Sequence, residues 1–514
     1  MKTSFFAAAM RAARAVADAM FTHPLLVLAA LTLAQVLLRL ALSPALEMDE
    51  AEQIVWSQRL AAGYGVQPPL YTWLQWGVNH LFGGQSLLAL SVLKHSLLAA
   101  AYVLLWHSAK MQGLGTRCRW LAAASLLLLP TVCWMAVRDL THSVLLLPCT
   151  AWLYWALLRL LARPTPARFV ALGAALAAGM LAKYNFALIA APLLGAALLD
   201  PAQRRALFSR GWPLMPLTAA LLLAPHLLWL AGHWGEIATR MGDKLARGGI
   251  SAWPRLTALG QLFTDAPMAL ALWASVTFGC LGTGWLRRPP AAPASGAAQL
   301  LRRYLLLALL TLLALVLFAT PSRLTPRWLE PLAALLPMAV FLRRPELERH
   351  PRCRRLAACI ALVAVLGMFL ATMRPVWHMF SHRPDDINLD TAALAAAARD
   401  AGFDTRSPIV APVRQVLAGN LRLAYPDAPV LQCPRAGCTP LLEELERQGS
   451  GWLLVLELEV EHSKLPASQR AQLHEVYLPF RRPLLGGWLP ASRDALRHTI
   501  WMHWQPPAAA ANTP

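Results

Sequence analysis

Charged residues are scarce in this sequence. They make up 14% of the 514 residues, and hydrophobic residues make up 57%, whereas about a quarter of an ordinary soluble domain is charged. The composition excludes such a domain and indicates a chain whose solvent is largely lipid. The net charge of +20 would suit nucleic acid, but the basic residues form short clusters between long apolar runs. That pattern is typical of a membrane protein, and we expect no nucleic-acid partner.

Several motifs are missing as well. The 8 cysteines show no zinc-ligand spacing, and no internal repeat is visible. The absence of a glycine-rich phosphate loop fits a protein without a nucleotide site. No clear cleavage site follows residues 1–22, so we expect an uncleaved first membrane helix. Cys433 and Cys438 bracket a polar loop, and we predict a disulfide if this loop faces the oxidising periplasm; the alternative is two free thiols.

The long apolar runs predict eleven membrane helices. Each approaches the length of about 20 residues that a span requires. The runs lie near residues 23–42, 86–106, 120–136, 141–161, 167–182, 184–199, 212–231, 266–286, 304–320, 328–342 and 356–373. Basic clusters occupy alternate loops and the N-terminal segment, which places that side in the cytoplasm. An odd number of spans then places the C-terminus in the periplasm of a bacterial inner-membrane protein.

The composition changes after residue 373, where polar and charged residues become common. Residues 408–412 and 451–460 have the pattern of strands, and residues 389–401 and 439–448 that of helices. We therefore predict a transmembrane domain over residues 1–373, with a first outer loop at 43–85. A small periplasmic α/β domain is predicted over residues 374–514.

Four acidic residues fall within six positions directly after the first span. They are Glu47, Asp49, Glu50 and Glu52, and topology does not call for them, because acids contribute little to orientation. In a helix, Asp49 and Glu52 would share one face and Glu50 would point elsewhere. One interpretation is a functional carboxylate site. The other is a solvated helix start, since acids favour a helix N-terminus.

Other polar and aromatic side chains lie in the predicted outer turns. Each cation alone could snorkel to the membrane edge, and each aromatic ring could anchor the interface. Together they could form an anion-binding cavity beside a carboxylate, as a lipid-phosphate substrate would need. The set comprises Tyr64, Gln67, Tyr71, Arg138, Asp139, His142, Lys183, Tyr184, Arg323 and Arg327.

The order of these motifs resembles the bacterial branch of glycosyltransferase family 39, which is related to protein O-mannosyltransferases and lipid A aminoarabinose transferases. The resemblance covers roughly residues 20–350 and rests on Asp49-Glu50-Ala51, Gln67-Pro68-Pro69-Leu70-Tyr71, Arg138-Asp139, Lys183-Tyr184-Asn185 and Pro326-Arg327-Trp328. It implies a GT-C fold, a membrane helix bundle with its active site on the outer face. It also implies sugar transfer from a polyprenyl-phosphate carrier to an acceptor hydroxyl.

The resemblance further implies roles for single residues. Asp49 would be the general base, with Glu50 as its neighbour, and Asp139 would support the acceptor or orient Asp49. Candidates for binding the carrier phosphate are Lys183, Arg138, Arg323 and Arg327, and candidates for lining the substrate are Gln67, Tyr64, Tyr71, Tyr184 and His142. Several relatives have lysine or histidine where this chain has Gln67. Either another cation contacts the phosphate here or the polar head differs.

Two other functions compete with this one. A transporter or flippase of lipid-linked sugars would show intramembrane charges or broken helices in paired repeats, whereas here the charges gather at one face. An O-antigen ligase or polymerase would place its key residues in a large late outer loop. The transferase hypothesis predicts inversion and no required cofactor or metal, with a divalent cation left open. It leaves open the sugar and an acceptor that is a lipid, a glycan or a protein.

Overall fold

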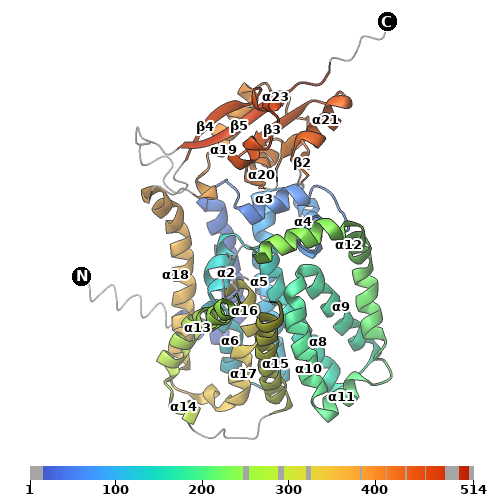
Figure 1. The fold of residues 1–514 in the computed structure, drawn as a ribbon. Coiled ribbons are helices and arrows are strands. Elements are labelled where there is room, and N and C mark those ends of the chain that lie inside the picture. The colour runs from blue at the N-terminus through green and yellow to red at the C-terminus, as the bar shows by residue number, and fades with distance from the viewer. Residues whose placement is uncertain are drawn as a thin grey trace, which may run out of the picture. The chain divides into compact units, whose positions relative to one another are not determined.

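The computed structural model describes residues 15–246, 254–287, 295–319, 326–381, 385–412, 414–434, 437–457, 459–480 and 497–508 (Figure 1). The chain forms two compact units. Unit 1 comprises residues 1–34, 61–71 and 94–368, and unit 2 comprises residues 35–60, 72–93 and 369–514. Most of the predicted first outer loop belongs to unit 2 together with the C-terminal residues, and the domain boundary at residue 373 stays a prediction.

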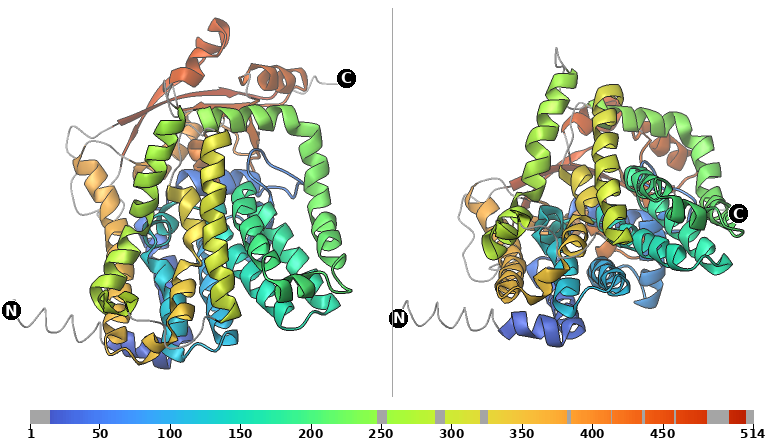
Figure 2. Two further views of the ribbon diagram at one scale, coloured as in Figure 1. Left: turned by 60° about the horizontal axis from the view of Figure 1, so that its bottom comes forward. Right: turned by 90° about the horizontal axis from the view of Figure 1, so that it is seen from below.

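Unit 1 is a bundle of apolar helices that run roughly alongside one another (Figures 1 and 2). Its elements are α6 (Thr116–Ala124), η1 (Ser125–Leu128), η2 (Thr131–Met135), α7 (Ala136–Arg138), α8 (His142–Ala162), α9 (Pro166–Ala182), η3 (Tyr184–Phe186), α10 (Ala187–Leu198), α11 (Pro201–Leu207), α12 (Leu214–Ala246), α13 (Pro254–Leu281), α14 (Gly284–Arg287), α15 (Gly296–Ala319), α16 (Pro326–Ala333), α17 (Leu336–Arg343) and η4 (Pro345–Arg349). Residues 15–22 are helical too. Helix α9 packs against both α8 and α12, and α10 packs against α15.

Three long helices contribute residues to both units. They are α2 (Pro24–Leu42), α5 (Leu87–Met111) and α18 (Cys353–Phe380). Their leucine- and alanine-rich sequences favour helix, and each is long enough to cross the hydrocarbon core. All three belong to the candidate membrane spans.

The described residues contain 7 helices long and apolar enough to span a membrane, or up to 9 if two bent pairs each count as one span. The bent pairs join residues 116–128 to 131–138 at 71° and residues 184–198 to 201–207 at 114°. Pro130 lies in the first break, where it removes a backbone donor, and Pro201 begins α11 directly after the second break. The runs predicted at 167–182 and 328–342 form shorter apolar helices, Pro166–Ala182 and Pro331–Arg343. The polytopic helical fold is confirmed.

Unit 2 contains one five-stranded sheet in the order β2-β1-β3-β5-β4. The strands are β1 (Ile409–Ala411), β2 (Val430–Gln432), β3 (Trp452–Leu456), β4 (His474–Pro479) and β5 (Arg497–Gln505). The strands β2, β1 and β3 are parallel, and β3, β5 and β4 are antiparallel. The other elements are η5 (Asp386–Asn388), α19 (Thr391–Asp400), α20 (Val416–Ala424), α21 (Thr439–Arg447), α22 (Glu459–Ser463) and α23 (Ala467–Arg470). The predicted small α/β region is confirmed.

The predicted strand over residues 451–460 is only half correct. Strand β3 ends at Leu456, and the short helix α22 begins at Glu459. Glu457 lies beyond the strand, where its carboxylate pairs with Arg414 at 2.8 Å. In the second half of the run Glu457 therefore lies outside the strand, and residues 459–460 belong to a helix.

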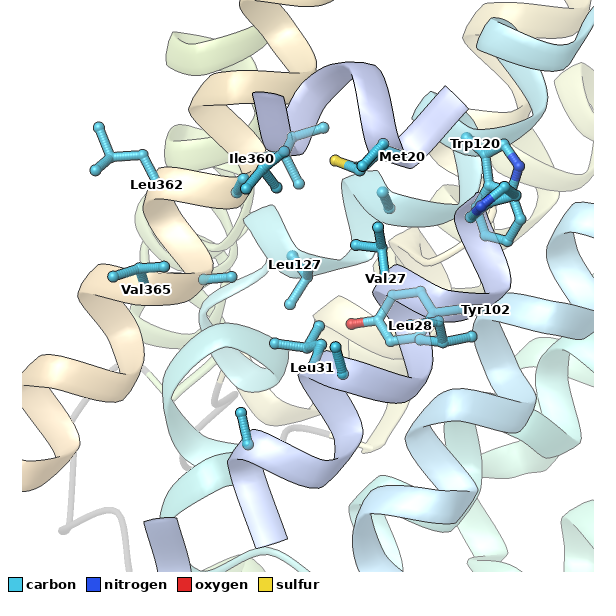
Figure 3. Close-up of a pocket in the computed structure, with 18 of the residues that line it drawn as sticks. Met20, Val27, Leu28, Leu31, Tyr102, Trp120, Leu127, Ile360, Leu362 and Val365 are labelled. Carbon is cyan, nitrogen blue, oxygen red and sulfur yellow. The ribbon is translucent and has the colours of Figure 1, made fainter. Parts of the chain in front are cut away.

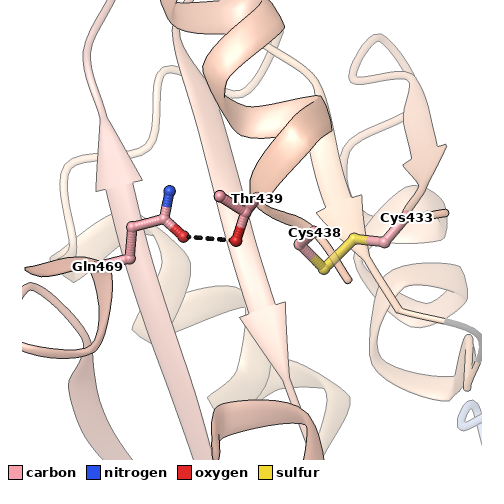
Figure 4. The surroundings of a disulfide bond; sticks show 4 residues. All are labelled: Cys433, Cys438, Thr439 and Gln469. Atoms are coloured by element: carbon pink, nitrogen blue, oxygen red, sulfur yellow. Dashed lines mark hydrogen bonds between the residues drawn. A yellow bond between two sulfur atoms is a disulfide. The ribbon is translucent and has the colours of Figure 1, made fainter. Parts of the chain in front are cut away.

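A disulfide joins Cys433 to Cys438 in unit 2, with an S–S distance of 2.09 Å (Figure 4). It links the residue after β2 to the N-cap of α21. In the next position Thr439 donates a hydrogen bond to the amide oxygen of Gln469 at 3.1 Å. Both cysteines are buried in a core cluster that includes Val410 and Trp452.

Two helices of the first outer loop pack in unit 2. Helix α3 (Met48–Trp56) lies against α20 so closely that a Cβ on Gly419 would stand 2.8 Å from the Cβ of Ala51. The backbone N–H of Leu46 donates to Asn420 Oδ1 at 3.1 Å. Thr72 of α4 (Leu70–Leu81) donates to Gln53 of α3 at 2.9 Å. These contacts fix the helix that carries the acidic cluster.

Candidate active site

Helix α3 begins inside the acidic cluster. Glu47 is the N-cap, and Asp49 and Glu50 lie in the first turn. Backbone N–H groups at a helix N-terminus are unpaired and carry partial positive charge, so a carboxylate there is stabilised in its ionised form. This position suits a group that must accept a proton at neutral pH.

Glu50 is fully buried and held by Arg39 of α2. The Arg39 guanidinium donates to both carboxylate oxygens at 2.5–3.2 Å. Glu50 Oε2 also accepts from the backbone N–H of Glu47 at 3.1 Å. Arg39 in turn donates to the carbonyl oxygens of Ser43 and Ala45, both at 2.8 Å. Glu50 therefore ties the end of α2 to the start of α3, and this geometry favours an anchoring role for it.

Glu47 is also buried in an ion pair. Arg374 of α18 donates to Glu47 Oε1 at 2.6 Å and pairs with Asp385 as well. Asp386 pairs with Arg414 at 2.7 Å. Burial raises the pKa of Asp386 above its ordinary value, and Arg414 opposes that shift. One carboxylate oxygen each from Glu47, Asp385 and Asp386 lies within 4.8 Å of the others, and each of the three carboxylates pairs with one of the two arginines.

Asp49 and Glu52 differ from these anchors because they are only half-buried. They are three residues apart on α3, so they share one face. Asp49 lies in the first turn and Glu52 one turn later. The structure thus separates the four acids into two buried ion-pair partners and two half-buried carboxylates.

In unit 1, Arg138 is the last residue of α7 and Asp139 is its C-cap. Arg138 Nε approaches Asp139 Oδ2 at 3.6 Å. Asp139 Oδ1 is buried and has no hydrogen-bond partner among the described residues. A buried carboxylate oxygen without a donor is costly, so this atom is suited to accept a hydrogen bond from a bound molecule.

The N-terminus of α8 brings three predicted site residues together. His142 is the first residue of α8, and its ring lies 5.5 Å from that of Tyr71, centroid to centroid. The ammonium of Lys183, which follows α9, donates to Ser143 Oγ at 2.8 Å. A lysine at the positive end of a helix, with backbone N–H groups nearby, forms a favourable environment for an anion.

Tyr184 of η3 stacks with a row of three aromatic rings on α12. Its hydroxyl lies 2.9 Å from His226 Nε2, and His226 Nδ1 lies 2.8 Å from the carbonyl oxygen of Ala62. The rings of Tyr184, His226, Trp229 and His233 stack in sequence with interplanar angles of 16–17°. A Cβ on Gly63 would stand 2.2 Å from the Trp229 ring, so only glycine fits there. These rings pack against residues 62 and 63 of the segment 61–71.

Two other predicted residues lie on the same segment. The Tyr64 hydroxyl accepts a hydrogen bond from the backbone N–H of Ala61 at 2.8 Å. Gln67 is half-buried. Arg323 and the side chain of Arg327 lie outside the described part of the chain.

Comparison with known proteins supplies the family. The family model of dolichyl-phosphate-mannose-protein mannosyltransferases matches residues 66–229. The lipopolysaccharide core galacturonosyltransferase RgtB of Rhizobium johnstonii is 31% identical over 432 residues, which cover 83% of this chain and 86% of that protein. RgtA of the same organism, described in the same words, is 30% identical over 415 residues, covering 79% and 81%. The chain belongs to this family of GT-C glycosyltransferases.

A solved structure supports the same fold. The crystal structure of ArnT from Cupriavidus metallidurans bound to undecaprenyl phosphate superposes with a TM-score of 0.57 at 14% sequence identity. The match covers 94% of this glycosyltransferase and 98% of that chain. The resemblance to family 39 and the polytopic GT-C fold are thus confirmed, and the glycosyltransferase is a multi-span membrane protein.

Three residues that contact the predicted site residues of this glycosyltransferase were not predicted. Arg39 and Arg374 hold Glu50 and Glu47, and His226 connects Tyr184 to Ala62. Each lies within or at the end of an apolar run. An ionisable residue in such a run normally has a partner or a function, and this signal could have identified all three.

Proposed function

We propose that this glycosyltransferase transfers a galacturonosyl residue from a polyprenyl-phosphate carrier to a hydroxyl of the lipopolysaccharide core. The observation that carries the proposal is the similarity to two lipopolysaccharide core galacturonosyltransferases over about four-fifths of the chain, 83% and 79%. We further propose that transfer takes place on the periplasmic face of the bacterial inner membrane, with the N-terminus in the cytoplasm. The alternating basic loops support this orientation.

In this proposal Asp49 is the general base. The acceptor hydroxyl attacks C1 of the sugar while its proton passes to the Asp49 carboxylate. The bond between C1 and the phosphate oxygen breaks, and its electron pair leaves with the polyprenyl phosphate. Attack opposite the leaving group inverts the configuration at C1. General-base help of this kind contributes roughly 10² to 10⁴ in rate, and Asp49 lies in the first turn of α3, where a helix terminus attracts negative charge.

Lys183 is assigned to the leaving phosphate. Its ammonium lies at the N-terminus of α8 through its hydrogen bond to Ser143. As the C1–O bond breaks, negative charge accumulates on the phosphate oxygens, and fixed positive charge stabilises that change. Because a phosphate is already a good leaving group, the proposed reaction needs neither a general acid nor a metal or cofactor.

Asp139 is assigned to the acceptor. Its buried Oδ1 atom has no donor among the described residues and can accept a hydrogen bond from a sugar hydroxyl. Such a contact orients the acceptor and leaves proton transfer to Asp49. Tyr71, His142 and Tyr184 would line the substrate around the α8 terminus.

The test uses a strain that lacks this protein, complemented with wild type or with Asp139→Asn. Mass spectrometry of its lipopolysaccharide is expected to show core species lighter by one uronic acid residue. Complementation with wild type should restore the heavier core species. Purified enzyme should transfer radiolabelled galacturonic acid from its polyprenyl-phosphate carrier to the isolated core. If the core is unchanged and a different sugar is missing from another envelope molecule, the assigned sugar and acceptor are refuted.

A further inference from the structure

Unit 1 contains a cavity of about 570 Å³ that no residue of the candidate active site lines (Figure 3). Its walls come from residues 16–34, from Tyr102 of α5, from α6 and η1, and from α18. The lining is aliphatic except for Tyr102 and Trp120, and Figure 3 shows Leu28, Leu31 and Leu127 facing the same space. The volume falls in the range of ligand pockets, about 300–1,000 Å³.

The cavity lies at the end of the bundle that carries the basic loops. On α18, which begins at Cys353, the lining residues run from Ile360 to Met368. At a rise of about 1.5 Å per residue they lie roughly 10–22 Å from the start of the helix. The hydrocarbon core of a bilayer is about 30 Å thick. The cavity therefore lies largely within the leaflet next to the basic loops, at the depth of acyl chains.

Two arginines contact residues that neighbour the cavity lining in the sequence. Arg354 Nε pairs with Asp18 Oδ1 at 2.9 Å, and both side chains are largely exposed, 63% and 49%. Asp18 lies between the lining residues Val16 and Ala19. The Arg117 guanidinium lies 5.9 Å from the ring of Phe21, which directly follows the lining residue Met20.

These features match a two-part ligand with an apolar chain and an anionic head. We propose that the cavity holds one acyl chain of an anionic phospholipid from the leaflet next to the basic loops, with its phosphate at Arg117 and Arg354. A guanidinium has five N–H donors, so Arg354 can bind a phosphate and keep its contact with Asp18. Basic pockets between membrane helices bind anionic headgroups in this way.

The proposal does not depend on the sugar-transfer chemistry. It commits to a phospholipid because the arginines stand at the membrane surface on the basic side. A polyprenyl carrier would be held by its tail alone unless its phosphate reached the same arginines. The two ligands share an apolar chain and a phosphate, so the experiment must separate them.

The test is native mass spectrometry of the full-length purified protein with added phosphatidylglycerol or phosphatidylcholine. Wild type is expected to retain one phosphatidylglycerol at concentrations that leave phosphatidylcholine unbound. Ala361→Phe, which fills the cavity, should weaken retention of phosphatidylglycerol at least about tenfold. Arg354→Gln should abolish the preference between the two lipids. Leu31→Trp serves as a second filling variant if Ala361→Phe does not fold.

Matched controls are Ala220→Phe on the exposed surface of α12 and Arg204→Gln on α11, neither of which lines the cavity. Both should bind lipid like wild type. Equal retention by wild type and by a folded filling variant would overturn the proposal. Displacement of phosphatidylglycerol by equimolar undecaprenyl phosphate would also overturn it, because the carrier would then be the occupant.

Discussion

The ammonium of Lys183 and the hydroxyl of Ser143 are joined by a hydrogen bond of 2.8 Å. Ser143 lies in the first turn of α8, so the contact holds a cation at the positive end of a helix. The two residues are 40 positions apart in the chain. The contact places Lys183 beside a helix N-terminus, where a cation and backbone N–H groups together favour an anion.

Replacing Lys183 by Met is expected to raise the KM for the polyprenyl-phosphate sugar about tenfold or more, which corresponds to about 1.4 kcal/mol. The side chain keeps its length but loses the charge that we assign to the phosphate. Steady-state kinetics with varied donor would measure this. Ser143→Ala is the matched control, because it removes the hydrogen bond and keeps the cation, and it should change KM much less. If Lys183→Met leaves the donor KM unchanged, Lys183 only snorkels.

The buried pair of Arg39 and Glu50 predicts a large loss of stability. Arg39→Met leaves the Glu50 carboxylate buried without its partner, which costs about 3–5 kcal/mol. Thermal unfolding in detergent should show a clear fall in Tm. Arg447→Gln, which removes an exposed ion pair with Glu444, should cost less than about 1 kcal/mol. Equal Tm values for the two variants would contradict the anchoring role.

The contact between α3 and α20 predicts a difference between two glycines. Gly419→Ala would place a Cβ 2.8 Å from Ala51 Cβ, whereas a Cβ on Gly77 would meet nothing within 4 Å. Both glycines lie inside helices, where alanine is intrinsically better by about 1 kcal/mol. Gly77→Ala should therefore leave Tm unchanged or raise it, and Gly419→Ala should lower it. A raised Tm in both would show that α3 and α20 pack loosely.

His503 predicts a dependence of stability on pH. Burial lowers the pKa of His503 below its ordinary value of 6.5. The unfolded chain then binds more protons than the folded chain at pH values below about 6.5, so acidification destabilises the fold. In His503→Phe the fall in Tm between about pH 7.5 and pH 5 should be smaller than in wild type. An identical fall in both proteins would assign the acid sensitivity to other groups.

Part of this architecture could be read from the sequence because its signals are local. The apolar runs, the alternating basic loops and the acidic cluster after the first span lie in contiguous stretches of the chain. Pro130 lies inside the run predicted over residues 120–136, and a proline there is a local signal for a break in the helix. The strand predicted over residues 451–460 failed in its second half because Glu457 pairs with Arg414, a tertiary contact.

The roles of the four acids could not be separated in this way. Glu47 pairs with Arg374, which is 327 positions away, and Glu50 pairs with Arg39 on the preceding helix. Neither partner is specified by the composition around residue 47. The two hydrogen bonds of His226, to Tyr184 and to Ala62, also join residues far apart in the sequence. The candidate site residues could be identified from the sequence, whereas their ion-pair partners could be identified only from the fold.

The central claim is that Asp49, alone among the four acids after the first span, takes the proton of the acceptor hydroxyl. The most direct measurement compares galacturonosyl transfer by purified Asp49→Asn and Glu52→Gln with transfer by wild type, at equal folded protein. Each variant removes one charge from the same face of α3. We expect Asp49→Asn to lower kcat by roughly 10² to 10⁴ and Glu52→Gln to remain close to wild type. Wild-type turnover by folded Asp49→Asn would contradict the claim.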